Sequence, residues 1–343
     1  MIDVHAHIGV PAAAVHAQKL AGYDDHLAAV ARRYASPATA AYMAQVSKAW
    51  QHALTDRAQR LSAMAAALVT AQVLSVNPGQ YYYWAEKRAA SDLTEIINEH
   101  ISAEVAARPD LFAGLGTVCL QHPELAADQL TRAVEHWGLA GIEISTQAAG
   151  RDLADPAFDP LWSAAESLDA VVFIHPLGCP QLADRLAPAY LANVAGQPLE
   201  TTIALSLLIF SGVLDRHPRL RLCAAHGGGY LPHYIGRSER AYGVRPDSHT
   251  MERPPADYLR RLWFDSVVHA PDVLARLVAA VGASRVVIGT DYPFDMGDEH
   301  PARTLAGTGL PEPDRARIAD TNALELLGSH ASRLSNRPSI PAT

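Results

Sequence analysis

Five residues that can bind metals or transfer protons end or lie within short apolar runs of this 343-residue chain. His5 and His7 lie in the first run, His175 and His226 end two later runs, and Asp291 ends the last one. Imidazole nitrogens and carboxylate oxygens are common ligands of zinc and related divalent cations. The sequence therefore predicts one divalent cation, provided that the fold brings these distant residues together.

The first of these groups is a His-x-His pair in Asp3-Val4-His5-Ala6-His7. Side chains alternate between the two faces of a strand, so both imidazoles point the same way. A His-x-His pair alone is a weak signal, because such pairs also occur on protein surfaces. Its place within an apolar strand favours a buried metal site.

His175 and Asp291 each follow an apolar, β-branched run, at Val171–His175 and Val286–Gly289. Pro176 cannot donate to a sheet, so the first of these strands should end there. A hydrogen-bonded core histidine is an equal alternative for His175 taken alone. A carboxylate at a strand end is costly to bury without a cation or donors, although Asp291 can also cap a helix.

His226 ends a fourth apolar run and is followed by three glycines, Gly227 to Gly229. Glycine allows backbone conformations and close ligand approach that other residues resist, although three glycines can also form only a flexible turn. Imidazole titrates near neutral pH, so His226 is suited to accept or return a proton.

Strand-like and helix-like segments alternate along the chain, which is typical of parallel strands joined by helices. The expected strands are Ile2–Ile8, Leu68–Val76, Phe112–Val118, Gly141–Ser145, Val171–His175, Leu220–Ala225, Trp263–Val267 and Val286–Gly289. Helical patterns include Asp92–Ala107, Glu124–Trp137, Pro160–Leu168 and Pro271–Val281. Eight such units predict an α/β fold, a (β/α)₈ TIM barrel, with a doubly wound open sheet as the alternative.

In a barrel the five residues would meet on one face, at the C-terminal ends of strands one, five, six and eight, where barrel enzymes place their active sites. We expect one metal-dependent domain over residues 1–330 and a loose tail over 331–343. Residues 10–60 interrupt the pattern and predict a small helical insertion after strand one. This insertion is interpreted as a cap over the site, with a purely structural decoration as the alternative.

Composition excludes several kinds of partner. Hydrophobic residues make up 49% of the chain and charged residues 19%, and the formal net charge is −8. Without a basic stripe or a long apolar run, we expect no nucleic-acid or membrane partner and predict a small-molecule substrate. The three cysteines form no paired motif, and the first residues do not form an apolar signal, so a cytoplasmic location is expected.

Four motifs, in this order, resemble the amidohydrolase superfamily: Asp-x-His-x-His, His-Pro, Ala-His-Gly-Gly-Gly and Gly-Thr-Asp-Tyr-Pro-Phe. They resemble most its branch of aminocarboxymuconate-semialdehyde decarboxylase and related aromatic-acid decarboxylases. Further similar stretches lie at 83–84, 197–204, 236–237 and 245–247. The resemblance covers nearly the whole chain.

The resemblance implies roles for the five residues. His5, His7, His175 and Asp291 would be the metal ligands, most often for Zn²⁺, with Mn²⁺ as the alternative. His226 would be the general base or proton relay, so that the catalytic residues are His226 and Asp291. The lysine that bridges two ions elsewhere in the superfamily has no counterpart in the fourth strand, which favours a single ion.

The resemblance also indicates substrate contacts. Arg237 resembles an arginine that reaches the substrate carboxylate of a neighbouring subunit, which implies a homodimer. A surface salt bridge is the alternative role for Arg237. Apart from the resemblance, the aromatic residues Phe294 and Tyr230 are expected to line a pocket for a flat substrate, with core or rim packing as the alternative. The chain departs from the named decarboxylase at Leu177, where that enzyme has tryptophan, and near Trp50, where it has an arginine. The substrate is therefore expected to differ from the semialdehyde.

The predicted function is non-oxidative decarboxylation of a small unsaturated or aromatic carboxylic acid by a metal-dependent carboxy-lyase. The same ligands would also suit a metal-dependent hydrolase of a lactone, an amide or a C–C bond, because a divalent ion lowers the pKa of bound water from ~15.7 towards ~7. A metal-binding barrel without turnover is a third alternative. Asp265, after the seventh strand, is expected to orient a ligand histidine.

Overall fold

The described strands of the core are all parallel and run in chain order. A computed structural model describes residues 1–33, 36–332, 334 and 337. A three-stranded sheet and a five-stranded sheet make up the core. Their strands are β1 (Ile2–Ile8), β2 (Ala71–Val76), β3 (Phe112–Gly114), β4 (Gly141–Ile144), β7 (Val171–Ile174), β8 (Arg221–Ala224), β9 (Trp263–Asp265) and β10 (Val286–Val287).

Three isolated bridges close these sheets into a barrel. Parallel bridges join Asp3 to Ile288 and Ala6 to Tyr292, so β1 lies beside the end of β10. A third bridge, from Gly116 to Ile142, joins the end of β3 to β4. The predicted (β/α)₈ barrel is therefore confirmed, and the open-sheet alternative is wrong.

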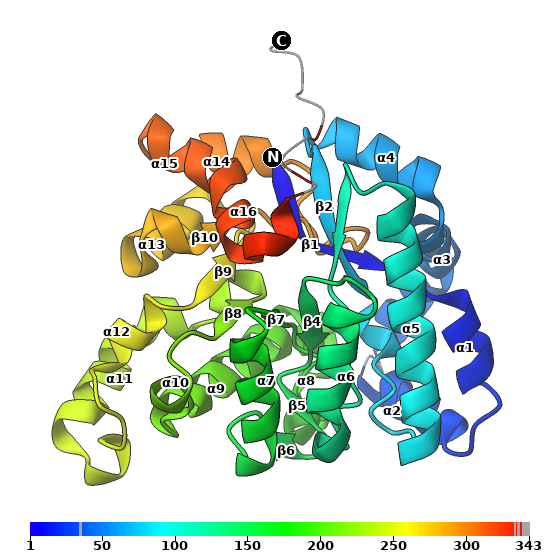
Figure 1. Ribbon diagram of the computed structural model, residues 1–343, viewed down its shortest axis with the longest axis horizontal. Helices are drawn as coiled ribbons and strands as arrows, with labels where there is room; N and C mark the ends of the chain where they lie inside the picture. The colour runs from blue at the N-terminus through cyan, green and yellow to red at the C-terminus, as the bar shows by residue number, and fades with distance from the viewer. Residues whose placement is uncertain (34–35, 333, 335–336, 338–343) are drawn as a thin grey trace.

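Helices surround the strands (Figure 1). They are α1 (Pro11–Ala17), α2 (Tyr23–Arg33), α3 (Pro37–Thr55), α4 (Arg57–Ala66), α5 (Lys87–Ala107), α6 (Pro123–Glu135), α7 (Asp159–Ser167), α8 (Ala183–Leu186), α9 (Gln197–Phe210), α10 (Val213–Arg216), α11 (Leu231–Val244), α12 (Pro255–Leu259), α13 (Pro271–Val281), α14 (Pro301–Ala306), α15 (Glu312–Ala316) and α16 (Asn322–Leu327). In α13 the buried residues Leu274, Leu277, Val278 and Val281 recur at helical spacing, so one face packs inward.

The barrel strands are buried on both faces, as parallel strands under a helical layer must be. In β7, Val172 and Ile174 belong to the cluster that includes the surrounding helices. Val171 and Phe173 belong to a second cluster, formed by strand residues and α16. His175 follows the last residue of β7. Because side chains alternate between faces, it lies on the same face as Val171 and Phe173, towards the interior.

The predicted insertion over residues 10–60 contains α1, α2, α3 and the start of α4. Figure 1 shows α1, α2 and α3 together at one side of the barrel. A short antiparallel hairpin, β5 (Gln147–Ala148) and β6 (Arg151–Asp152), follows β4. The predicted tail over residues 331–343 lies largely outside the described residues.

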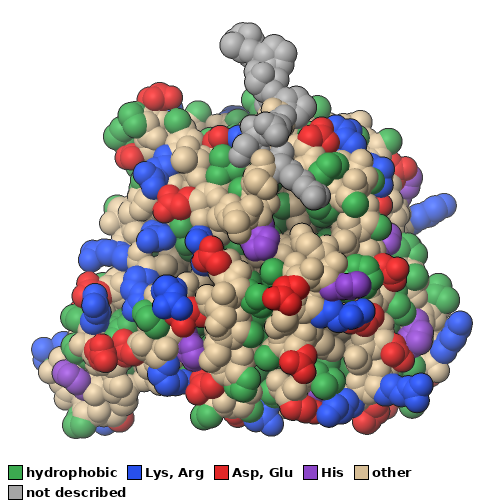
Figure 2. Space-filling view, viewed as in Figure 1, with side chains coloured by type: hydrophobic (Ala, Val, Ile, Leu, Met, Phe, Trp, Pro, Cys, Tyr) green, Lys and Arg blue, Asp and Glu red, His purple; other side chains and the backbone are tan. Residues whose placement is uncertain are grey.

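Two observations bear on the excluded partners. On the face seen in Figure 2, Lys and Arg side chains are interspersed with Asp and Glu side chains. Among the described helices, none combines the length and the apolar character needed to cross a membrane.

Candidate active site

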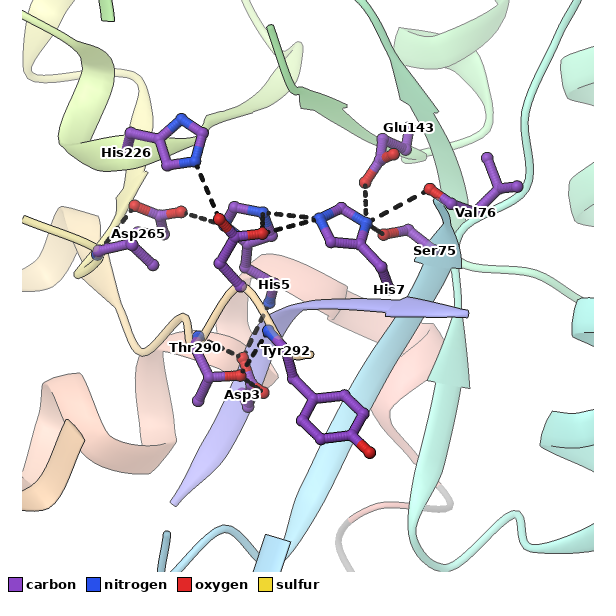
Figure 3. Close-up of polar contacts among 12 residues, drawn as sticks. Asp3, His5, His7, Ser75, Val76, Glu143, His226, Asp265, Thr290 and Tyr292 are labelled. Carbon is purple, nitrogen blue, oxygen red and sulfur yellow. Dashed lines mark hydrogen bonds and ion pairs between the residues drawn. The ribbon is translucent and has the colours of Figure 1, made fainter. Parts of the chain in front are cut away.

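Three of the five predicted residues meet atom to atom at the end of β1. The Nε2 atoms of His5 and His7 are 3.1 Å apart. One oxygen of Asp291, Oδ1, lies 3.1 Å from Nε2 of His7 and 3.3 Å from Nε2 of His5. Figure 3 shows the rings of His5 and His7 facing each other from β1.

The other two histidines complete the cluster from β7 and β8. The ring centroid of His175 lies 5.0 Å from those of His5, His7 and His226. One ligand atom from each of His5, His175, His226 and Asp291 lies within 4.8 Å of the others. The fold thus brings together all five residues that the sequence singles out, and their roles stay predictions.

The hydrogen bonds around His5 and His7 fix which ring nitrogens carry protons. Nδ1 of His5 lies 2.5 Å from Oδ2 of Asp265, and Nδ1 of His7 lies 3.3 Å from the carbonyl oxygen of Val76. Both partners are acceptors, so each Nδ1 donates and each Nε2 faces inward. The expectation that Asp265 orients a ligand histidine therefore agrees with the geometry.

The arrangement fits a cation. With the ring protons on Nδ1, the Nε2 atoms of His5 and His7 and one carboxylate oxygen of Asp291 face one another at 3.1 to 3.3 Å with no proton between them. Such a set repels itself unless a positive charge lies between its members. Ligands about 2.1 Å from one ion, at angles near 90–110°, are about 3.0–3.4 Å apart, which matches the observed spacing.

Burial and the neighbouring charges set the protonation states. Burial raises the pKa of Asp291, but His5, His226 and His7 outweigh it and hold that pKa well below its usual range. Burial lowers the pKa of His175 well below its usual range, and the neighbouring His7, His5 and His226 lower it further. A charged carboxylate and a neutral imidazole are the forms that bind metals.

His226 and Asp291 both adopt left-handed backbone conformations, with φ of 54° and 57°. Such conformations are uncommon outside glycine and cluster at functional sites. The three glycines after His226 form a closely packed turn, and the alternative of a flexible turn does not hold. A Cβ on Gly229, whose φ is +66°, would lie 2.1 Å from the carbonyl oxygen of Pro198.

A buried polar network supports the backbone of the His-x-His strand. Asp3 accepts hydrogen bonds from the backbone of His5 and Thr290, and from the side chains of Thr290 and Gln72. Arg60 donates to Oε1 of Gln72 and, at 2.5 Å, to the carbonyl oxygen of His7. Burial lowers the pKa of Arg60 to about 10, so its guanidinium remains charged at neutral pH.

Replacing Arg60 by alanine is expected to lower the free energy of unfolding by about 2–4 kcal/mol, because two buried acceptors lose their donor. Urea unfolding followed by circular dichroism measures the change. Arg57→Ala is the control, since Arg57 is 41% exposed in its ion pair with Glu104 and should contribute under about 1 kcal/mol. Equal losses in the two variants would contradict this role for Arg60.

Sequence reasoning missed Glu143, a fully buried glutamate on β4. Its Oε2 lies 3.8 Å from Nδ1 of His7. The signal was available, because a charged residue interrupts the apolar run of this strand. It also missed Arg60, which no local pattern distinguishes from the exposed arginines nearby.

The predicted substrate residues have different surroundings. The ring of Phe294 lies 5.5 Å from the ring of His7, and Trp50 of α3 packs edge-on against Phe294 at 5.5 Å. Tyr230 is 42% exposed at the start of α11. Arg237 is exposed on α11, and no ion pair involves it within the described part of the chain. Phe294 therefore borders the five-residue cluster, whereas Arg237 lies on the surface of this single chain.

Comparison with known proteins identifies the family. The model of the amidohydrolase family described as "Amidohydrolase" matches residues 2–329. The 2-amino-3-carboxymuconate-6-semialdehyde decarboxylase of Dictyostelium discoideum is 38% identical over 263 residues, which cover 76% of this chain and 73% of that protein. The chain therefore belongs to the amidohydrolase family.

Solved structures agree with this assignment. A 2,6-dihydroxybenzoate decarboxylase in complex with 2,6-dihydroxybenzoate has a TM-score of 0.80 and 26% identity, covering 95% of this chain and 98% of the other. A dihydroxybenzoic acid decarboxylase from Polaromonas sp. JS666, with bound manganese and 2-nitroresorcinol, has a TM-score of 0.79 and 22% identity, covering 95% and 96%, and shares the fold. The prediction of a decarboxylase is confirmed over the hydrolase alternative.

Proposed function

We propose that this decarboxylase acts on a small aromatic or unsaturated carboxylic acid, with one divalent cation held by His5, His7, His175 and Asp291. The observation that supports this most is the inward convergence of two imidazole Nε2 atoms and one carboxylate oxygen at 3.1 to 3.3 Å. A bound divalent cation supplies the positive charge that stabilises negative charge developing on a substrate oxygen.

His226 is assigned the proton transfer. Its Nε2 lies 3.4 Å from Oδ2 of Asp291, and its side chain is 17% exposed, so it can reach both the cluster and a bound acid. As an imidazolium it adds a proton to the carbon that bears the carboxylate. The bond from that carbon to the carboxylate then breaks, its electron pair returns to the conjugated system, and carbon dioxide leaves. Asp291 steadies the charged form of His226 before the transfer.

Aromatic side chains beside the cluster support a flat substrate. Phe294 lies against His7, and Trp50 holds Phe294 edge-on. Ring stacking and burial favour a planar conjugated acid over a branched aliphatic one.

Zinc remains the proposed ion with manganese as the alternative, because imidazole and carboxylate ligands suit both.

A homodimer is proposed from the surface of α11. Tyr230, Tyr234, Arg237 and Val244 recur at helical spacing, and Tyr234 is 70% exposed. A partner covering this stripe would place Arg237 beside a neighbouring site, where its fork suits a substrate carboxylate. The proposal requires dimers in sedimentation equilibrium.

A cytoplasmic location is proposed from the three free, buried cysteines.

The activity is tested by measuring carbon dioxide release from a panel of aromatic and unsaturated acids. At least one hydroxylated benzoate or conjugated dicarboxylate is expected to release carbon dioxide in equal amount to the protonated product. A matched panel of lactones and amides serves as the control. Hydrolysis of those compounds without carbon dioxide release from any acid would overturn the proposal.

A further inference from the structure

The strand that lacks the superfamily lysine contains an acid that the proposed reaction does not use. Glu143 lies in the middle of β4, and its side chain has no solvent exposure. Placing a carboxylate in the barrel interior is costly unless donors or positive charge compensate it. The groups that its two carboxylate oxygens face therefore indicate the role of Glu143.

Each oxygen of Glu143 faces a different group. Oε1 accepts a hydrogen bond of 2.6 Å from the hydroxyl of Tyr81. Oε2 is buried without a hydrogen-bond partner in the described part of the chain and lies 3.8 Å from Nδ1 of His7. At that distance Oε2 acts through its charge, while the carbonyl oxygen of Val76, at 3.3 Å, is the nearer acceptor.

Tyr81 holds Glu143 in this orientation. Its ring is 5% exposed and stacks on Tyr83, with centroids 5.2 Å apart and planes at 16°. The hydroxyl of Tyr83 in turn accepts a hydrogen bond from the backbone of Ser145, next to the end of β4. The side chain of Glu143 is thus fixed by the stacked pair of Tyr81 and Tyr83. Figure 3 shows its carboxylate facing the ring of His7.

We propose that Glu143 is a positioning residue that keeps the proton of His7 on Nδ1 and so keeps Nε2 free to bind the metal. A carboxylate accepts but does not donate, so it favours the ring form whose Nδ1 carries hydrogen. Asp265 faces Nδ1 of His5 in the same way, but through a direct hydrogen bond of 2.5 Å. Each imidazole of the His-x-His pair then has its own buried carboxylate on the side away from the cluster.

The inference rests on the proposed metal site, and Glu143→Gln tests it with little change of shape. The amide oxygen can still accept from Tyr81, which turns the amide N–H groups towards Nδ1 of His7. The negative charge that favours a proton on Nδ1 would then be lost and an amide donor would face that nitrogen, although the carbonyl oxygen of Val76 remains an acceptor. The ring form with its proton on Nε2, which blocks metal binding, therefore becomes more populated. Glu200→Gln is the matched control, because Glu200 is also buried, at 4% exposure, but contacts Thr146 and Gln147.

The experiment titrates metal-stripped full-length protein with Mn²⁺ and follows the free ion by electron paramagnetic resonance. Glu143→Gln is expected to raise the dissociation constant about 10–100-fold, the range for partners that orient metal-binding histidines, and Glu200→Gln less than about 3-fold. In ¹⁵N spectra of the metal-free proteins, the proton of one histidine should move from Nδ1 to Nε2 in Glu143→Gln. The wild-type protein and Glu200→Gln should not show this change.

Tyr81→Phe is the second variant and decides the case if Glu143→Gln does not fold. It keeps the stacked ring but releases Glu143, and it is expected to raise the Mn²⁺ dissociation constant by about 3-fold or more. Wild-type affinity and unchanged ¹⁵N spectra in the folded variants would overturn the inference for Glu143. Wild-type protein that binds no Mn²⁺ or Zn²⁺ would instead overturn the proposed metal site.

Discussion

His226→Ala is expected to lower kcat about 10²–10⁴-fold while the protein keeps its bound metal, because a general acid–base group contributes that much. The hydrogen-bond contact of His226 with the cluster is to Oδ2 of Asp291, at 3.4 Å, whereas Oδ1 of the same carboxylate faces His5 and His7. Removing the imidazole therefore leaves the proposed ligand set in place. Steady-state kinetics and metal analysis of the purified variant measure both effects.

His233→Ala is the control for this prediction. His233 is an exposed histidine on α11, close to His226 in the sequence and outside the cluster. It should retain wild-type kcat within about 2-fold, as surface substitutions usually do. If His226→Ala turns over at the wild-type rate, the proton transfer belongs to another group. If it loses its metal, His226 is itself a ligand.

Removing the metal is expected to have the largest effect, a loss of carbon dioxide release on the order of 10³-fold or more. Without the cation, the Nε2 atoms of His5 and His7 and the carboxylate of Asp291 surround no positive ion. The positive charge that would stabilise the reacting oxygen is then lost. Dialysis against a chelator followed by assay measures the loss. Adding Zn²⁺ or Mn²⁺ back, in separate samples, should restore turnover and identify the better ion.

Protein dialysed in the same way without chelator is the control for handling losses. Metal-free protein should also melt at a lower temperature, because an ion that binds only the folded state stabilises it. A fully stripped sample that still releases carbon dioxide at the normal rate would contradict both the metal site and the chemistry assigned to it.

The sequence predicted the barrel because its signals are local. Each strand is a short β-branched run, and the helices between them show helical spacing, as in α13. The boundaries were less certain, since β3 ends at Gly114 and β10 at Val287, short of the runs that predicted them. The residues beyond those ends still bridge to neighbouring strands, which is why the barrel closes.

The five residues of the candidate site were also accessible from the sequence. A parallel barrel brings the C-terminal ends of its strands to one face, so residue types at strand ends are sufficient to predict that they meet. His5, His175 and Asp291 are far apart in the chain, but His5 lies at the middle of β1, and the other two follow β7 and β10. Their convergence follows from topology.

What the sequence did not determine is the support around these residues. Arg60, Gln72 and Glu143 act through contacts with residues distant in the chain, and no local pattern encodes a contact of that kind. Which ring nitrogen of His7 bears a proton depends on Val76 and Glu143, from two other strands. Residue type and order along the chain thus determined the barrel and the groups gathered at its rim. Only the packed structure decided how those groups are oriented, because orientation depends on neighbours that the fold supplies.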